Sequence, residues 1–327
     1  MVLSPSSSQE SAPSGLPVLF LMGPTAAGKS GLALRLAARF PLEIVNADSV
    51  QVYRGMDIGS AKPSLSERQQ VPHHLIDITQ PDDPFSAGRF HQLAMDIMAQ
   101  IHGRGHVPLL VGGTGLYFRV VEKGIAAIPE IDESWREAVR QRAREVGWPF
   151  LHQQLMAVDP VWAATITPMD GQRILRGLSV WQATGRTLSY WQGIGQTPLV
   201  NPLLKLAVNR PREQLYPLID QRFDHMMEAG LLAEVNALLA QGYHRELPAM
   251  KAVGYRQLLF HLLDGLPLQQ AVELAKQESR RYAKRQLTWL RREENLHWLT
   301  AGDEQTPFAL VHHFLQEFGF SSCAESV

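Results

Sequence analysis

The chain has 327 residues, of which 45% are hydrophobic and 19% charged, enough to bury one large core and a smaller second unit. Its net charge of −1 means that any surface for nucleic acid must be local, because the molecule as a whole carries no positive field. The single cysteine, Cys323, excludes a disulfide framework and a cysteine-based zinc site, so we expect an intracellular, cytoplasmic protein.

The N-terminal residues 1–15 are rich in serine and proline and contain neither lysine nor arginine. This composition predicts a disordered leader rather than a secretory signal. The apolar runs that follow, such as residues 18–22, are much shorter than the roughly 20 residues of a membrane span. We therefore expect no membrane partner.

A glycine-rich loop follows this first apolar run, with Gly23, Gly28, Lys29 and Ser30 at the spacing G-x-x-x-x-G-K-[ST]. Loops of this kind turn backbone N–H groups onto phosphate oxygens, and the N-terminus of the next helix adds a positive field. Lys29 would bridge the terminal phosphates, and Ser30 would offer its hydroxyl to Mg²⁺. The pattern predicts that the loop binds a phosphate chain, but it does not say of which molecule.

Three more apolar runs, residues 42–45, 72–78 and 107–111, have the length and composition of buried strands. Helical spacing over residues 87–101 separates the last two. Strands alternating with helices at this interval predict an α/β fold with a parallel, doubly wound sheet, in which ligands gather at the carboxyl ends of the strands.

A block of helical patterns without strands follows, and we assign residues 128–199 to an inserted all-helical subdomain. Asp132 and Asp170 stand at the expected helix starts, and Gly147 and Gly185 at the expected ends. The apolar residues 203–208 then read as a strand that returns to the sheet. The core domain is therefore predicted to combine residues 16–127 with residues 200–327.

The last third of the chain is helical by its periodicity, over residues 212–241, 255–263 and 268–298. Between Lys276 and Arg292, seven basic residues stand against one acidic residue, Glu278. A solvated helix face and a surface for the RNA backbone are both compatible with this charge.

Two aspartates at predicted strand ends are candidates for chemistry. Asp48 directly follows the strand next to the glycine loop, where it could act in a site or cap a turn. Asp77 lies in an apolar run and could be a metal ligand or a cap. The chain has neither an N-K-x-D nor a D-x-x-G segment after the loop that would indicate a GTP switch.

Several motifs in order along the chain resemble the tRNA dimethylallyltransferase family. They are G-P-T-A-A-G-K-S, N-A-D-S-V-Q-V-Y-R-G-M-D-I-G-S-A-K-P, P-H-H-L-I-D-I, V-G-G-T-G-L-Y-F, Q-R-I-L-R, V-G-Y-R-Q and R-Y-A-K-R-Q-L-T-W-L-R. The resemblance implies a P-loop NTPase-like sheet flanked by helices. It also implies transfer of a dimethylallyl group from dimethylallyl diphosphate to N6 of the adenosine on the 3′ side of the tRNA anticodon. The loop would then hold a leaving group rather than ATP.

The resemblance also implies roles for residues around the loop. Asp48 would accept a hydrogen bond from the adenine amine and take its proton late, because an aspartate of ordinary pKa is too weak a base to do so earlier. Arg222, Lys29, Thr25 and Mg²⁺ held by Ser30 would stabilise the leaving group. The diphosphate-binding residues implied are Gly23, Pro24, Thr25, Ala26, Ala27, Gly28, Lys29 and Ser30. Relative to the family, Ser30 replaces a threonine and Ala27 a serine.

The tRNA-binding residues implied fall into several groups, for each of which an ordinary surface or capping role is the alternative. The segment after the second strand would meet the flipped base, the strand-end Thr114 would bind nearby, and the insertion and the last long helix would grip the anticodon stem-loop. They are Asp48, Ser49, Val50, Gln51, Thr114, Arg136, Gln172, Arg173, Ile174, Leu175, Arg176, Arg281, Lys284 and Arg285.

Three other functions remain open from the sequence. The same core could prenylate free AMP, ADP or ATP, although the insertion and the basic helix argue against that. The loop alone would suit a small-molecule kinase, and an RNA-binding protein could carry the loop as a purely structural element. For the prenyltransferase that the resemblance implies, we expect a monomer.

Overall fold

A computed structural model describes residues 15–194 and 197–321. The predicted leader, apart from Gly15, and Cys323 lie outside the described residues. The chain divides into two compact units, one formed by Met1–Arg119 with Val200–Val327 and the other by Val120–Leu199. The second unit therefore begins eight residues before the predicted start at residue 128. In the part of the chain described, no helix combines the length and apolar character needed to cross a membrane.

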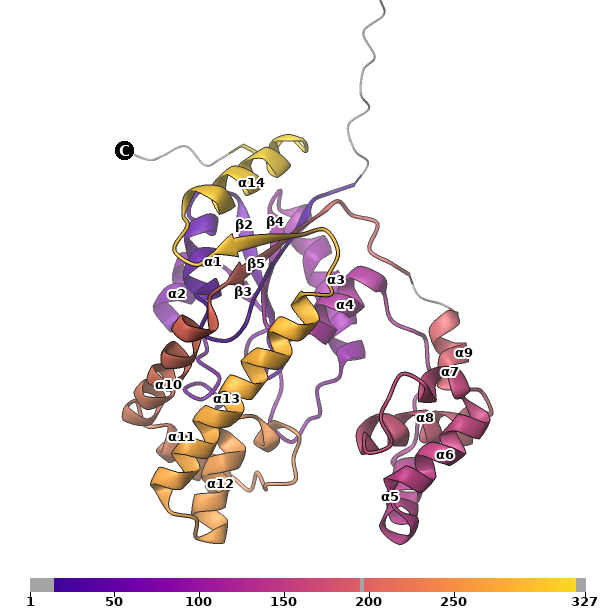
Figure 1. Ribbon diagram of the computed structural model, residues 1–327. Helices are drawn as coiled ribbons and strands as arrows, with labels where there is room; N and C mark the ends of the chain where they lie inside the picture. The colour runs from indigo at the N-terminus through magenta and orange to yellow at the C-terminus, as the bar shows by residue number, and fades with distance from the viewer. Residues whose placement is uncertain (1–14, 195–196, 322–327) are drawn as a thin grey trace, which may run out of the picture. The chain divides into compact units, whose positions relative to one another are not determined.

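The first unit is built on a six-stranded sheet in which every pair is parallel, in the order β3-β2-β4-β1-β5-β6 (Figure 1). This confirms the predicted α/β class with its parallel sheet flanked by helices. The strands are β1 Val18–Met22, β2 Leu42–Ala47, β3 His73–His74, β4 Val107–Gly112, β5 Leu203–Asn209 and β6 Leu296–Thr300.

Two strand predictions need correction. The run over residues 72–78 forms only the two-residue β3, because Leu75 and Asp77 adopt positive φ angles of 61° and 56° that do not fit a strand. The predicted helix over residues 268–298 ends at Leu290, and Leu296–Thr300 instead forms the edge strand β6.

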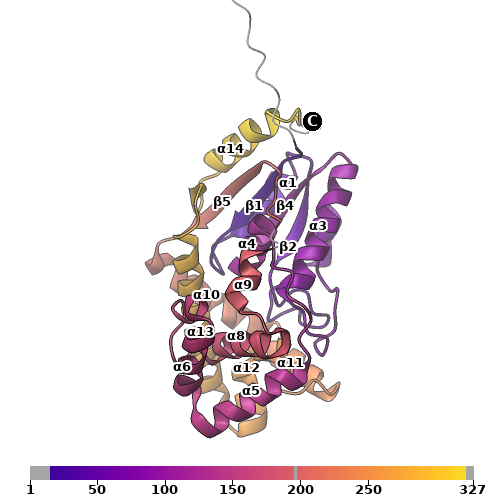
Figure 2. The same cartoon turned by 90° about the vertical axis from the view of Figure 1, so that its right-hand side faces the viewer.

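The central strand β1 explains how the sheet is held between helices. All five of its residues are buried, and successive side chains point to opposite faces. Leu19 and Leu21 join a core with α1, α10 and α14, whereas the Phe20 ring packs against Phe118 of α4 at 5.0 Å. Figure 2 shows α3 running beside the sheet. Burial on both faces accounts for the continuous apolar runs of the sequence.

The helices of the first unit and of the connecting segment α4 are α1 Lys29–Ala37, α2 Leu65–Gln70, α3 Ala87–Gly103, α4 Gly115–Lys123, α10 Arg212–Glu228, α11 Leu231–Ala240, η1 Ala249–Lys251, α12 Tyr255–Asp264, α13 Leu268–Leu290 and α14 Gln305–Gln316. The helices α11, α12 and α13 form a second core with Val52 and Met56, which lie on the long loop after β2. From this core α13 runs toward β6 (Figure 1). The helix therefore connects the helical layer with the sheet.

The second unit is entirely helical, with α5 Glu133–Val146, α6 Trp148–Val158, α7 Pro160–Ala163, α8 Gly171–Thr184 and α9 Leu188–Gly193. The predicted caps are confirmed. Asp132 and Asp170 accept backbone hydrogen bonds at the starts of α5 and α8, and Gly147 and Gly185 end these helices with positive φ angles. A core around Leu151 and Leu155 holds the helices together.

Candidate active site

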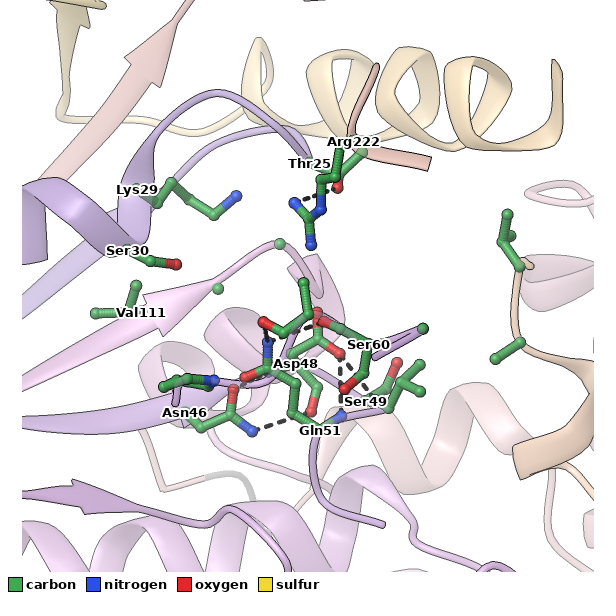
Figure 3. Close-up of a pocket in the computed structure, with 18 of the residues that line it drawn as sticks. Thr25, Lys29, Ser30, Asn46, Asp48, Ser49, Gln51, Ser60, Val111 and Arg222 are labelled. Atoms are coloured by element: carbon green, nitrogen blue, oxygen red, sulfur yellow. Dashed lines mark hydrogen bonds between the residues drawn. The ribbon is translucent and has the colours of Figure 1, made fainter. Parts of the chain in front are cut away.

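The carboxyl ends of β1, β2 and β4 lie side by side because these strands are neighbours in the sheet. The glycine loop follows β1, Asp48 follows β2, and Thr114 follows β4. Their loops, together with α10 and α13, line a cavity of about 360 Å³ (Figure 3). Thr25, Lys29 and Asp48 all line it, so the structure brings together the residues predicted to act chemically.

The glycine loop has the unusual backbone angles that its sequence predicts. Gly28 has a φ of 100° and Gly23 a φ of 154°, both in the region that favours glycine. A side chain at Gly23 would also lie 3.0 Å from the Val208 carbonyl oxygen. The loop leads directly into α1, whose first residue is Lys29, so the open N-terminal N–H groups of that helix face the same region.

Two cations meet at this loop. Desolvation, together with the charge of Arg222, lowers the pKa of Lys29 to about 7, although Asp48 opposes the shift. The Lys29 ammonium donates to the Pro24 carbonyl oxygen at 2.8 Å, within the loop itself. Burial likewise lowers the pKa of Arg222. Loss of hydration and repulsion between the two charges disfavour the charged form of each side chain. An anionic ligand between them would offset both effects.

Arg222 is positioned by α10 and by Thr25. Its Nη1 donates to the Thr25 hydroxyl oxygen at 3.2 Å, and Figure 3 shows the two side chains meeting above the cavity. On the same face of α10, Ile219, Phe223 and Met226 also line the cavity, at helical spacing. The cavity thus has a cationic end and an apolar wall along one helix.

Asp48 caps a turn and also lines the cavity. Its Oδ1 accepts hydrogen bonds from the backbone N–H groups of Val50 at 2.8 Å and Gln51 at 3.4 Å, as a turn-capping aspartate does. The buried Asn46 accepts from the Asp48 N–H and donates to the Leu75 carbonyl, which fixes the turn from behind. The described residues include no donor to Oδ2, so one carboxylate oxygen is available to a ligand.

Asp77 is held in an ion-pair group away from the cavity lining. It accepts from Lys62 at 2.6 Å and from Arg68 at 2.7 Å. Burial raises its pKa, but the hydrogen bonds and charges of these two partners outweigh that effect and keep the pKa below its ordinary value. Asp77, which follows β3, therefore holds the loop after β2 through Lys62 and the helix α2 through Arg68.

The G-G-T-G segment over residues 112–115, which begins at the last residue of β4, allows three close approaches. A side chain on Gly112 would lie 2.2 Å from the Ala47 carbonyl oxygen, and one on Gly113 would lie 2.1 Å from the amide nitrogen of Gln286. Gly115 lies against the Trp289 ring. Thr114 lies between Gly113 and Gly115 in the chain. Its hydroxyl accepts a hydrogen bond from the Ser49 N–H at 3.2 Å, which links the β4 loop to the Asp48 turn.

The loop over residues 57–61, which lines the cavity, is clamped by a carboxylate that the sequence analysis did not identify. Glu234 of α11 accepts from three consecutive backbone N–H groups of this loop and from the Tyr255 hydroxyl at 2.6 Å. Gln51 donates its amide to the carbonyl oxygens of Ser60 and Ala61 from the other side. The predicted base-contacting residue Gln51 therefore also supports this loop.

The basic residues of α13 fall into two groups. Lys276 and Arg280 pair with Asp224 and Asp220 of α10, so their charge is locally compensated. The predicted RNA-binding residues Arg281, Lys284 and Arg285 are exposed. Arg281 pairs with Glu278 in its own helix. Arg285 lines the cavity and lies over the Tyr282 ring.

In the second unit, the Q-R-I-L-R segment forms the first turns of α8. Gln172 and Arg173 are exposed, and burial together with the charge of Arg136 lowers the pKa of Arg176. Arg136 itself pairs with Glu133 of α5. The last two predicted RNA-binding residues are Ile174, fully buried in the core of the unit, and Leu175, partly buried against it. Ile174 therefore serves packing and offers no surface to RNA in this structure.

The chain is similar to known proteins over most of its length. The IPP transferase family matches residues 51–293. A tRNA dimethylallyltransferase of Magnetococcus marinus is 57% identical over 303 residues, covering 91% of this chain and 99% of the relative. One of Syntrophobacter fumaroxidans is 47% identical over 291 residues, covering 88% and 84%.

Two solved structures are also similar. A eukaryotic dimethylallyltransferase acting on tRNA superposes with a TM-score of 0.79 at 25% identity, covering 94% of this chain and 81% of that one. A tRNA isopentenylpyrophosphate transferase from Bacillus halodurans superposes with a TM-score of 0.67 at 36% identity, covering 92% and 95%.

Proposed function

Since this chain belongs to the IPP transferase family, we propose that it is a tRNA dimethylallyltransferase. It moves the dimethylallyl group of dimethylallyl diphosphate onto N6 of the adenosine on the 3′ side of the tRNA anticodon. The allylic carbon–oxygen bond breaks, a carbon–nitrogen bond forms, and diphosphate leaves with the electron pair of the broken bond. The proton lost from N6 completes the balance.

The observation that carries this proposal is the grouping of one carboxylate and two cations in a single cavity. Asp48 influences the pKa of both Lys29 and Arg222, so the three charges lie close enough to act on one substrate. A diphosphate requires the cations, and an amine nucleophile requires the carboxylate. The arrangement therefore supports transfer of a group from a diphosphate to an amine. Phosphate binding alone would not require the carboxylate.

The leaving group would be stabilised by the glycine loop. Backbone N–H groups over residues 23–30 and the N-terminus of α1 would meet its oxygens, while Lys29 and Arg222 supply full positive charge. Thr25 would hold Arg222 in place through the hydrogen bond already present. These groups would already be in place to stabilise the negative charge that develops on the bridging oxygen as the carbon–oxygen bond breaks.

The adenine amine would be oriented by Asp48. Its lone pair is delocalised into the ring, so it is a weak nucleophile that needs alignment with the allylic carbon. The free oxygen of Asp48 can accept a hydrogen bond from N6–H and take the proton as positive charge develops on nitrogen. The hydrogen bond that Oδ1 accepts from the Val50 N–H would hold the carboxylate in place during this step.

Mg²⁺ fits this site as an ion held mainly by the substrate. Ser30 lines the cavity with its hydroxyl. Over residues 15–194 and 197–321, no three His, Cys, Asp or Glu side chains are grouped to hold a metal by themselves. Magnesium commonly binds through few protein groups and several phosphate oxygens, and when bound it would neutralise charge on the diphosphate.

The RNA partner would be the anticodon stem-loop of tRNA. Arg281, Lys284 and Arg285 on α13 would contact the phosphate backbone, with Arg285 at the mouth of the cavity that receives the unstacked adenosine. Gln172, Arg173, Arg176 and Arg136 in the second unit would contact the stem or loop. We expect the enzyme to act as a cytoplasmic monomer.

Incubation with labelled dimethylallyl diphosphate, Mg²⁺ and either an anticodon stem-loop or AMP tests the proposal. We expect label in the RNA and little in AMP. Label in AMP alone would identify a nucleotide prenyltransferase instead. Label in neither, together with ATP consumption in a separate incubation with ATP and Mg²⁺, would identify a kinase.

A further inference from the structure

Gln286 of α13 connects two loops of the active site through one amide group. Its Oε1 accepts from the Thr25 backbone N–H at 2.9 Å, and its Nε2 donates to the Gly113 carbonyl oxygen at 3.0 Å. Gln286 is 3% exposed, so both hydrogen bonds are shielded from water. The partners belong to the loops after β1 and β4, which makes the amide a bridge between them.

The fit around this amide is tight. Gly113 has no room for a side chain because its Cβ would lie 2.1 Å from Nε2, and Gly115 has none because of the Trp289 ring. One helical turn before Gln286, burial and the charge of Asp48 raise the pKa of the Tyr282 hydroxyl to about 12, while side-chain hydrogen bonds with Thr114 and Gln286 oppose the rise. This face of α13 therefore contacts both loops at successive turns.

The same helix also carries exposed basic side chains, of which Arg285 lines the cavity whereas Arg281 and Lys284 lie on the face away from Gln286. Arg281, Lys284 and Arg285 are exposed and separated from Gln286 by one to five positions along α13. A rigid helix that carries a charged outer face and a hydrogen-bonded inner face moves both together. Any shift of α13 upon contact with an RNA backbone would thus reach Thr25 directly.

We propose that Gln286 is a positioning residue that couples RNA binding on α13 to the geometry of the glycine loop. The inference rests on the proposed function, in which α13 meets RNA and the loop meets diphosphate. RNA that holds α13 in place fixes the Thr25 N–H, and with it the hydroxyl that holds Arg222. Each ligand then strengthens the binding of the other, because coupling between two sites is reciprocal.

An amide is needed at this position because the bridge uses one acceptor and one donor. In Gln286→Glu the side chain can still accept from Thr25 but offers no N–H to Gly113. In Gln286→Leu it can do neither. Gln277 lies exposed on the same helix, so Gln277→Leu is a matched control for the loss of an amide.

The test measures the affinity for inorganic diphosphate with Mg²⁺, with and without a saturating anticodon stem-loop. In the wild type and Gln277→Leu, RNA should tighten diphosphate binding by about 5-fold or more. In Gln286→Leu that ratio should fall to near 1, and Gln286→Glu should lower it too. If Gln286→Leu is too unstable to assay, the Gln286→Glu ratio decides alone.

The coupling would be overturned by a ratio near 1 in the wild type, or by a Gln286→Leu ratio equal to that of the wild type. Where Gln286→Leu cannot be assayed, a Gln286→Glu ratio equal to that of the wild type would overturn it. Prenyl transfer by the wild type is measured in parallel. If the wild type prenylates the stem-loop but shows no coupling, only this inference fails. If it transfers no prenyl group to RNA, the proposed function fails.

Discussion

Arg222 on α10 donates a hydrogen bond to the Thr25 hydroxyl in the glycine loop at 3.2 Å, although the two residues are 197 positions apart in the chain. The contact brings a second cation to a loop that already carries Lys29. Because Arg222 is also buried there, protein groups rather than water hold its guanidinium in position. The proposed anion-binding site therefore includes both the loop and α10.

Thr25→Val should lower kcat/KM by about 10- to 100-fold, because it removes a hydrogen bond to a charged group while keeping the side chain's shape. Thr25→Ser keeps the hydroxyl and should stay within a few-fold of the wild type. Steady-state prenylation of a stem-loop measures both. Equal activity of the valine and serine variants would show that the hydroxyl contact with Arg222 does not matter for transfer.

Asp48→Asn and Asp48→Ala should separate the two roles of this aspartate. The asparagine variant can still accept at Oδ1 from Val50 and Gln51, so the turn should persist, but its proton-accepting carboxylate is lost. We expect kcat to fall by about 10² or more in both variants. RNA affinity should remain within a few-fold, at least in Asp48→Asn. Wild-type turnover in Asp48→Asn would remove the carboxylate from the mechanism.

The affinity for dimethylallyl diphosphate in the absence of RNA should fall as pH rises above neutrality. The pKa of Lys29 in the free protein is lowered to about 7. Below that pH the ammonium is already present, whereas above it a proton must be taken up on binding, which costs up to tenfold per pH unit. The ligand's own phosphate ionises near pH 6, so it is nearly fully ionised above pH 7.5.

Titration calorimetry between pH 7.5 and 9 measures this dependence. The control is Lys29→Met, which should bind more weakly but show a nearly flat profile, because it has no group at this position to protonate. A flat profile in the wild type would mean that the ammonium stays protonated throughout that range.

Glu43 on β2 should contribute acid-sensitive stability away from the active site. The hydrogen bond from Arg104, in the first place, and those with His74 and His106 lower its pKa from 4.5 to about 2, although burial opposes the shift. A depressed carboxylate pKa stabilises the fold fully above pH 4.5, and that stabilisation is lost as pH falls toward 2. The shift corresponds to about 3 kcal/mol.

Urea unfolding of the wild type and Glu43→Gln at pH 7, 5 and 3 tests this prediction. The variant should be less stable by about 3 kcal/mol at pH 7, and the difference should shrink at pH 3. A difference that stays constant from pH 7 to 3 would mean that Glu43 stabilises the protein by packing alone.

The sheet was predictable from the sequence to the extent that its strands are long and apolar. β1, β2 and β4 are buried on both faces and read as continuous apolar runs. β6 was not, because most of its residues are exposed and two of them are polar. The run over residues 72–78 was predicted as a strand, but only its first part forms β3. The positive φ angles at Leu75 and Asp77 depend on tertiary contacts that a local pattern does not contain.

In the site, the sequence motifs pointed to residues that act through local backbone geometry, such as Gly28, Lys29 and Asp48. Gln286 and Glu234 were missed because their partners are far away in the chain. The signal that could have found Gln286 was its place on the apolar face of α13, where an amide needs buried partners.

Two anticodon stem-loops, identical except at the position 3′ to the anticodon, test the central claim most directly. One carries adenosine there and the other carries purine riboside, which lacks the exocyclic amine. With labelled dimethylallyl diphosphate, the account predicts label in the adenosine stem-loop and none in the other. Equal label in both, or label in neither, would contradict transfer to N6 by this protein.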